Sequence, residues 1–148
     1  MWATRATRRC TAPIDALWFE YTEAREWPRW AKDIRSAAMN GAMGKGATGS
    51  VKFRGLPEAR FTITASEKPR FFGTRMELPL LRIQFEHHLA PGPDGTTVIT
   101  ECVDFHGLLG FLLGPIERLR FRLNWPAAIA EMDRLASRAR RDPATVEA

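Results

Sequence analysis

The chain has 148 residues, of which 45% are hydrophobic and 26% charged, and its formal net charge is +5. This length and balance predict one folded domain and exclude wholesale disorder. No run of 18 apolar residues exists, and no apolar segment follows the basic start MWATRATRRC. We therefore expect no membrane span and no secretion signal, and a cytoplasmic protein.

The beginning of the chain predicts one strand and two short helices. Residues 2–10 alternate enough for an edge strand. Residues 11–27 predict a helix, because Pro13 suits an early helical position where its missing N–H costs nothing. Pro28 breaks that helix, so residues 30–34 are expected to form a second short helix or turn.

The middle of the chain predicts a meander of antiparallel strands. Short alternating runs are separated by glycine and proline, which is typical of strands joined by tight turns. The strands are expected at residues 35–40, 46–54, 58–67, 70–78, 81–90 and 96–106. From Gly107 onward, apolar residues recur at spacings of three and four, which predicts a long helix. The domain is expected to end near residue 140, with a flexible tail over 141–148.

The basic residues are spread along the chain and are not gathered between aromatic residues. This pattern favours a solvated surface, and we expect no specific binding of nucleic acid. Cys10 and Cys102 lie in no metal-binding spacing and are expected to be reduced thiols. The glycines of residues 41–49 lack the spacing of a phosphate-binding loop. We expect neither a metal nor a cofactor.

Two ionisable residues interrupt the apolar rows of residues 82–105. Every second side chain of a strand shares a face, so His87 falls in the row of Phe85 and Leu89. Glu101 interrupts the next strand in the same way. If the two strands pair around the turn at 92–95, His87 and Glu101 are neighbours. Such a pair is either a satisfied polar pair inside the sheet or a general acid and base.

Other candidate groups have two interpretations each. In residues 70–78, either the row of Phe72 and Met76 faces inward, or the alternative row brings Arg75 inside, where it would bind an acidic group. The tryptophans could form an aromatic ligand box, although large aromatic residues on helices usually belong to the core. They are Trp18, Trp27, Trp30 and Trp125.

The segment TAPIDALWFEYTEAREWPRWAKDI resembles the start of the START-like superfamily, also called SRPBCC or Bet v 1-like. The closer similarity is to its bacterial polyketide cyclase/dehydrase branch, through the W-P-R-W element at 27–30. It continues through GATGSVKFRG and FEHHLAPGPDGTTVITECVDFHG. The resemblance implies an α+β helix-grip fold, in which a curved antiparallel sheet wraps around a long C-terminal helix and two short helices follow the first strand.

The resemblance also implies a cavity between the sheet and the last helix, suited to a lipid-like or polyketide-like molecule. The residues expected to line it are Trp18, Trp30, Phe53, Phe61, Ile63, Phe72, Met76, Ile83, Phe85, Ile99, Val103, Phe105, Leu112, Ile116, Leu119 and Leu123. We expect a hydrophobic ligand-binding protein, either monomer or homodimer. One alternative is a cofactor-independent cyclase or dehydratase using His87 and Glu101. Another is an interaction module for a protein or quinone-carrier partner.

Overall fold

The structure is a computed structural model that describes residues 2–141 of the chain. The expected tail at 141–148 therefore lies outside the described residues, except for Arg141. The elements are, in order, β1 (Trp2–Cys10), α1 (Ile14–Thr22), η1 (Ala24–Glu26), α2 (Trp27–Trp30), β2 (Ile34–Met39), β3 (Thr48–Phe53), β4 (Ala59–Glu67), β5 (Phe71–Leu78), β6 (Leu81–Pro91), η2 (Pro93–Gly95), β7 (Thr97–His106) and α3 (Gly107–Arg141).

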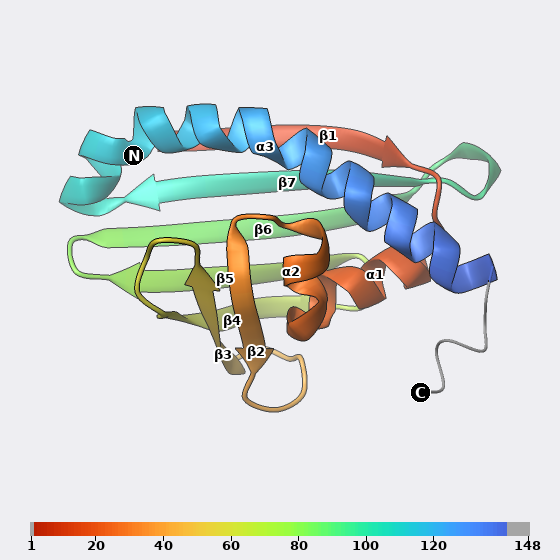
Figure 1. Ribbon diagram of the computed structural model, residues 1–148, viewed down its shortest axis with the longest axis horizontal. Helices are drawn as coiled ribbons and strands as arrows, with labels where there is room; N and C mark the ends of the chain where they lie inside the picture. Colours follow the sequence, from red (N-terminus) through yellow and green to blue (C-terminus); the bar gives the residue numbers. More distant parts are fainter. Residues whose placement is uncertain (1, 142–148) are drawn as a thin grey trace.

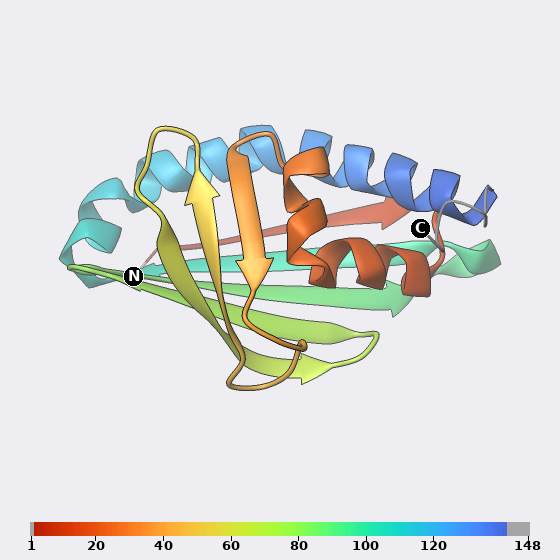
Figure 2. The same cartoon turned by 60° about the horizontal axis from the view of Figure 1, so that its bottom comes forward.

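The seven strands form one antiparallel sheet in the order β1-β7-β6-β5-β4-β3-β2. Strands β2 to β7 lie beside their neighbours in sequence because loops and tight turns connect them. Strand β1 completes the sheet by pairing with β7. The sheet is curved, and α3 runs along its length while α1 and α2 lie on the same side (Figures 1 and 2). The expected helix-grip fold is confirmed.

Strand positions agree with the sequence prediction to within two residues, but the first helices differ. Helix α1 ends at Thr22, and α2 covers Trp27–Trp30 in place of the expected turn at 30–34. Pro28 lies in the first turn of α2, where its missing N–H is harmless. The proline therefore belongs to the start of a helix, and the prediction that it breaks one was wrong.

Two glycines set the contact between α3 and the edge of the sheet. A Cβ atom on Gly114 would lie 2.2 Å from the Trp2 ring, and one on Gly110 would lie 3.0 Å from the Phe105 backbone. The Trp2 indole also donates a 2.8 Å hydrogen bond to the Phe111 carbonyl. The glycine side of α3 thus faces the sheet, and further along the helix the same side carries Trp125 and other buried residues.

The orientation expected for four residues of α3 was wrong. Leu112, Ile116, Leu119 and Leu123 are between 57% and 68% exposed. Successive residues of an α-helix are turned by about 100°, so this stripe lies nearly opposite the side that carries Gly110 and Gly114. The stripe is the stronger hydrophobic signal in the sequence, but only glycine permits the close approach to Trp2 and Phe105.

The core lies between the concave face of the sheet and the helices. Strand β7 has a strict alternation, with each odd-numbered residue from Thr97 to Phe105 buried. The largest fully buried side chains include Tyr21, Phe72, Leu17, Ile63, Ile99, Ile129 and Met132. None of the helices within residues 2–141 is both long and apolar enough to cross a membrane.

Candidate functional site

The register of β6 and β7 places His87 directly opposite Glu101. The same register pairs Phe85 with Val103 and Leu89 with Ile99, so the two expected rows lie side by side on the concave face. The His87 Nδ1 atom lies 3.5 Å from Glu101 Oε2. The contact expected from the alternation of these strands is therefore present.

Glu101 lies at the centre of a buried polar cluster. Its Oε2 atom accepts a 3.0 Å hydrogen bond from the Tyr21 hydroxyl and a 2.8 Å hydrogen bond from the Trp125 indole. Both donors are buried, so these bonds compensate for the removal of the carboxylate from water. The cluster connects β7 with α1 and α3, which lie on the concave side of the sheet.

The His87 ring is held among aromatic side chains. It stacks on Phe72 with a centroid distance of 4.2 Å and lies 5.0 Å from the Tyr21 ring. Its Nδ1 atom forms no hydrogen bond to the described residues, so the 3.5 Å contact with Glu101 is electrostatic. The His87 side chain is 12% exposed. The ring is thus fixed in position while part of it still reaches solvent.

The environment of Glu101 keeps the carboxylate ionised. Burial by itself raises the pKa of Glu101, but the electrostatic interaction with His87 and the hydrogen bonds from Trp125 and Tyr21 outweigh it. The pKa of Glu101 therefore lies below its usual value. Burial and the nearby Glu101 raise the pKa of Tyr21 well above its usual value, so the phenol keeps its proton and remains a donor.

The other expected ligand-binding residues fall into three groups. Nine are buried within the concave side of the sheet and its helices, namely Trp18, Trp30, Phe61, Ile63, Phe72, Met76, Ile99, Val103 and Phe105. Three are only partly buried: Phe53, Ile83 and Phe85. The remaining four are the exposed residues of α3 described above. Of the expected ligand-binding residues, therefore, the buried and the partly buried ones lie in the interior, and the four residues of α3 do not.

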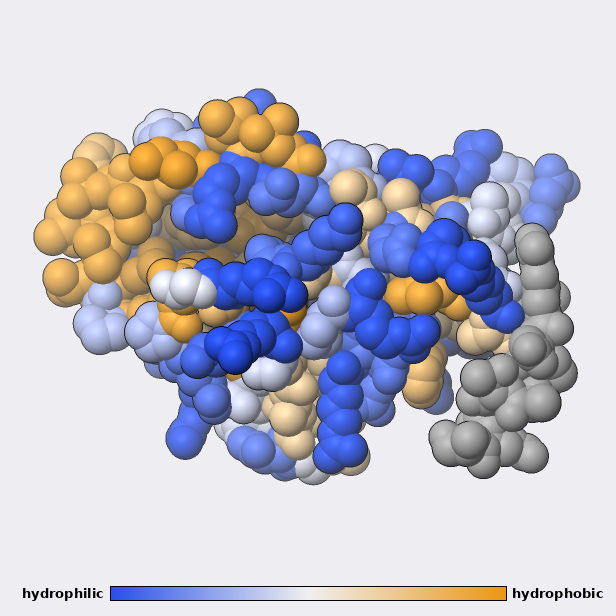
Figure 3. All heavy atoms as spheres, in the orientation of Figure 1, coloured by the Kyte–Doolittle hydropathy of each residue, from blue (hydrophilic) through white to orange (hydrophobic). Residues whose placement is uncertain are grey.

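A hollow lies on the concave side, beneath the first half of α3. Figure 3 shows hydrophobic atoms at its floor and hydrophilic side chains in front of it. The partly buried Ile83 and Phe85 belong to the inward row of β6 in this half of the sheet. In the other half, Ile129 and Met132 of α3 are fully buried in the core. The interior is therefore closed around Glu101 and more open toward the start of α3.

The burial pattern of β5 shows which of its two rows of side chains faces inward. Phe72, Thr74 and Met76 are buried, whereas Arg75 lies on the outer face. There its guanidinium is 3.5 Å from Glu77. The alternative interpretation, in which Arg75 enters the cavity and binds an acidic group, is wrong.

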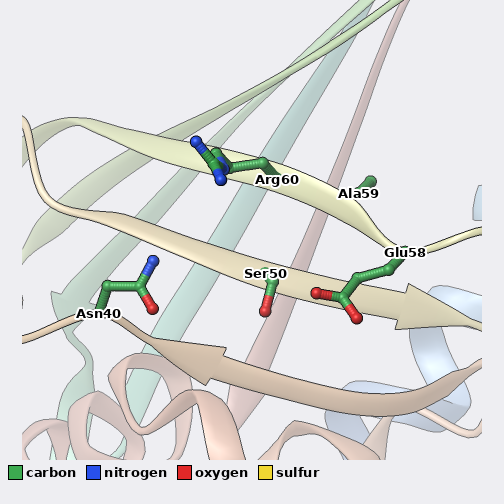
Figure 4. Close-up of a pocket in the computed structure, with 5 residues that line it drawn as sticks. All are labelled: Asn40, Ser50, Glu58, Ala59 and Arg60. Carbon is green, nitrogen blue, oxygen red and sulfur yellow. The ribbon is translucent and has the colours of Figure 1, made fainter.

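A second depression lies on the outer face of β3 and β4 and is shown in Figure 4. Its volume is about 360 Å³, and Asn40, Ser50, Glu58, Ala59 and Arg60 line it. The side chains of Ser50 and Arg60 point away from the concave face, because their neighbours Val51 and Phe61 are the buried members of the alternation. It is open, polar and separate from the His87–Glu101 cluster.

Sequence reasoning did not find the two donors to Glu101. Tyr21 and Trp125 are 80 and 24 residues away from it in the chain. Nothing in the sequence indicated that these two side chains share an acceptor. Within residues 2–141, no three histidine, cysteine or acidic side chains are arranged to hold a metal ion. Both cysteines are free thiols.

Residues 1–140 match the protein family described as "Polyketide cyclase / dehydrase and lipid transport". No curated protein sequence matches the chain. The similarity to solved structures is distant in sequence but extends over nearly the whole chain.

A crystal structure of a protein from Nitrosomonas europaea has a TM-score of 0.77 and 13% identity, covering 95% of this chain and 97% of its own. Ara h 8.0201 has a TM-score of 0.66 and 14% identity, covering 90% and 96%. Norcoclaurine synthase from Thalictrum flavum, in complex with dopamine and hydroxybenzaldehyde, has a TM-score of 0.69 and 15% identity, covering 92% and 86%. At these identities the similarity shows a shared fold.

Proposed function

Because the chain belongs to the polyketide cyclase / dehydrase and lipid transport family, we propose that it binds a small hydrophobic or aromatic molecule on the concave side of its sheet. The observation that carries this proposal is the hollow beneath the first half of α3. Apolar side chains that stay partly exposed on a concave surface gain free energy when a ligand covers them. The ligand class is lipid-like or polyketide-like.

The polar cluster would form one end of this binding site. Glu101 Oε2 is occupied by Tyr21 and Trp125, and none of the hydrogen bonds among the described residues reaches Oε1. One carboxylate oxygen and the partly exposed His87 ring are thus available to a polar group of the ligand. A few polar groups in an apolar site orient a ligand without dominating its affinity.

The test is saturable binding of a fluorescent fatty acid and its displacement by unlabelled fatty acids or aromatic polyketides. Ile83→Trp should fill the hollow and weaken binding by about tenfold or more, because apolar contact area is lost to the ligand. Leu56→Trp is the matched control, since Leu56 is exposed on a turn between β3 and β4 and its substitution should leave affinity unchanged. Binding that never saturates, or that is unaffected by Ile83→Trp, would contradict the proposal.

The second candidate is an enzyme of the cyclase or dehydratase type, and the His87–Glu101 contact favours it. Since the pKa of Glu101 is lowered, this carboxylate is a weak base near neutral pH, and His87 is the residue assigned to proton transfer. Glu101 would position the imidazole. His87→Gln should then slow turnover of a polyketide-like substrate by about a hundredfold while binding is retained. Equal turnover by the variant would exclude this role.

A further inference from the structure

Nine large hydrophobic side chains are exposed along the β5–β6 turn and the first half of α3. We call this set the leucine surface, and it consists of Leu78, Leu80, Leu108, Phe111, Leu112, Leu113, Ile116, Leu119 and Leu123. Each of them is at least 39% exposed. Figure 3 shows hydrophobic atoms gathered at the end of the molecule where α3 begins. A surface of this extent on a water-soluble fold indicates a binding face.

The turn between β5 and β6 is held against α3 and presents a strained leucine. The Leu109 amide donates a 3.0 Å hydrogen bond to the Leu80 carbonyl. Leu80 has a φ of 61° and is 63% exposed. The left-handed conformation costs a leucine about 1 kcal/mol or more, a cost that glycine would avoid. Because Leu80 is largely exposed, burial in the core offsets little of this conformational free energy. A contact with another molecule is therefore the better explanation for a leucine at this position.

Arginines border the stripe on both sides. At about 100° per residue, Arg120 and Arg122 lie on opposite flanks of the line from Leu112 to Leu123. Both arginines are exposed, and Glu117, which pairs with Arg120 at 3.0 Å, is the only acidic residue between 107 and 124. An apolar stripe with cationic side chains along its edges is the pattern of a helix that lies in the interface of an anionic membrane.

A second copy of the chain fits this pattern less well. Leu112, Ile116, Leu119 and Leu123 have the spacing of a two-helix seam, but Arg120 and Arg122 occupy both flanking positions. Two copies joined along this stripe would place Arg120 and Arg122 of both chains beside one seam, with Glu117 of each as the acidic residue of this part of the helix. Like charges at these positions disfavour pairing.

We propose that the leucine surface docks on an anionic lipid membrane. Its leucines and Phe111 would enter the region of the headgroups, while Arg120 and Arg122 would contact lipid phosphates. The protein would lie on the membrane without crossing it. The same end of the molecule lies beside the hollow, so a hydrophobic ligand would meet the membrane there (Figure 3). This inference does not depend on the proposed ligand, because docking is measured without one.

The test is flotation of the full chain with vesicles of phosphatidylcholine alone and of phosphatidylcholine with phosphatidylglycerol. The protein should float with the anionic vesicles, and added salt should release it. The double variant Leu119→Gln with Leu123→Gln should reduce binding by about tenfold or more. Arg120→Gln and Arg122→Gln should each reduce binding about fivefold. These side chains are exposed, so unfolding midpoints should stay close to that of the wild type.

Leu56→Gln is the matched control, because Leu56 is 55% exposed and lies outside the leucine surface. Its binding should equal that of the wild type. Absence of flotation, or equal flotation of the leucine double variant, would overturn the proposal. A dimer detected by sedimentation velocity and abolished by the double variant, without vesicle binding, would assign the surface to a second copy and overturn it as well. Fatty acid binding that survives in the double variant would separate docking from the ligand site.

Discussion

Trp125 on α3 donates its indole N–H to Glu101 Oε2 on β7 across 2.8 Å. This bond joins the last helix to β7, the strand next to the edge strand β1, within the core. A carboxylate that accepts two buried donors is held in one rotamer, and its charge strengthens both bonds. The relationship makes Glu101 a structural anchor of the fold as well as a candidate site residue.

Replacing Glu101 by glutamine should lower the free energy of unfolding by about 1 to 3 kcal/mol, because an amide cannot accept both donors as strongly and brings its own buried N–H groups. Urea denaturation at neutral pH measures the change. Glu86→Gln is the control, since Glu86 is exposed on the same sheet and its carboxylate pairs with the exposed His88. Its effect should remain within about 0.5 kcal/mol. Equal effects of the two variants would show that Glu101 is not an anchor.

Stability should fall at acid pH through Glu101. Its pKa in the folded protein is lowered, so the unfolded chain binds this proton more tightly. The resulting stabilisation is complete above the unfolded pKa of about 4.3 and is lost as pH falls through the folded pKa. The difference in unfolding free energy between wild type and Glu101→Gln should therefore shrink below about pH 4. A difference that stays constant from neutral to acid pH would contradict this assignment.

Cys10 should resist alkylation in the folded protein. Its side chain is fully buried, and burial together with the nearby Asp133 raises the pKa of the thiol to about 12. The reactive thiolate is therefore scarce at mildly alkaline pH. Mass spectrometry after iodoacetamide treatment should find Cys10 unmodified in buffer and modified in urea. Rapid modification in buffer would show that the end of β1 is open to solvent.

Gly114→Ala should destabilise the protein although alanine favours a helix by about 1 kcal/mol. The new methyl group would lie 2.2 Å from the Trp2 ring and 2.7 Å from the Trp2 Cβ atom, so β1 or α3 must shift. We expect a net loss of about 1 to 2 kcal/mol in unfolding free energy. Gly44→Ala is the control, because its Cβ would meet no atom within 4 Å. A stabilised Gly114→Ala variant would show that α3 does not approach Trp2 so closely.

The sequence by itself determined the sheet and the position of the polar pair in it. Side chains alternate with a period of two along a strand, and the turn at 92–95 fixes which residues of β6 and β7 face each other. These two local facts suffice to bring His87 opposite Glu101. The inward row of β5 stayed open at the sequence level because both of its rows contain aromatic residues, and burial in the structure decides it.

Only the tertiary structure decided what surrounds that pair and how α3 is turned. Tyr21 and Trp125 meet at one oxygen of Glu101 because three elements pack together, which no local pattern encodes. The helix carries a leucine stripe on one side and Gly110 and Gly114 on the other, and hydrophobicity alone favours burial of the leucines. The side that faces the sheet is instead the one that lets the backbone approach Trp2 and Phe105, because close packing depends on shape across the interface.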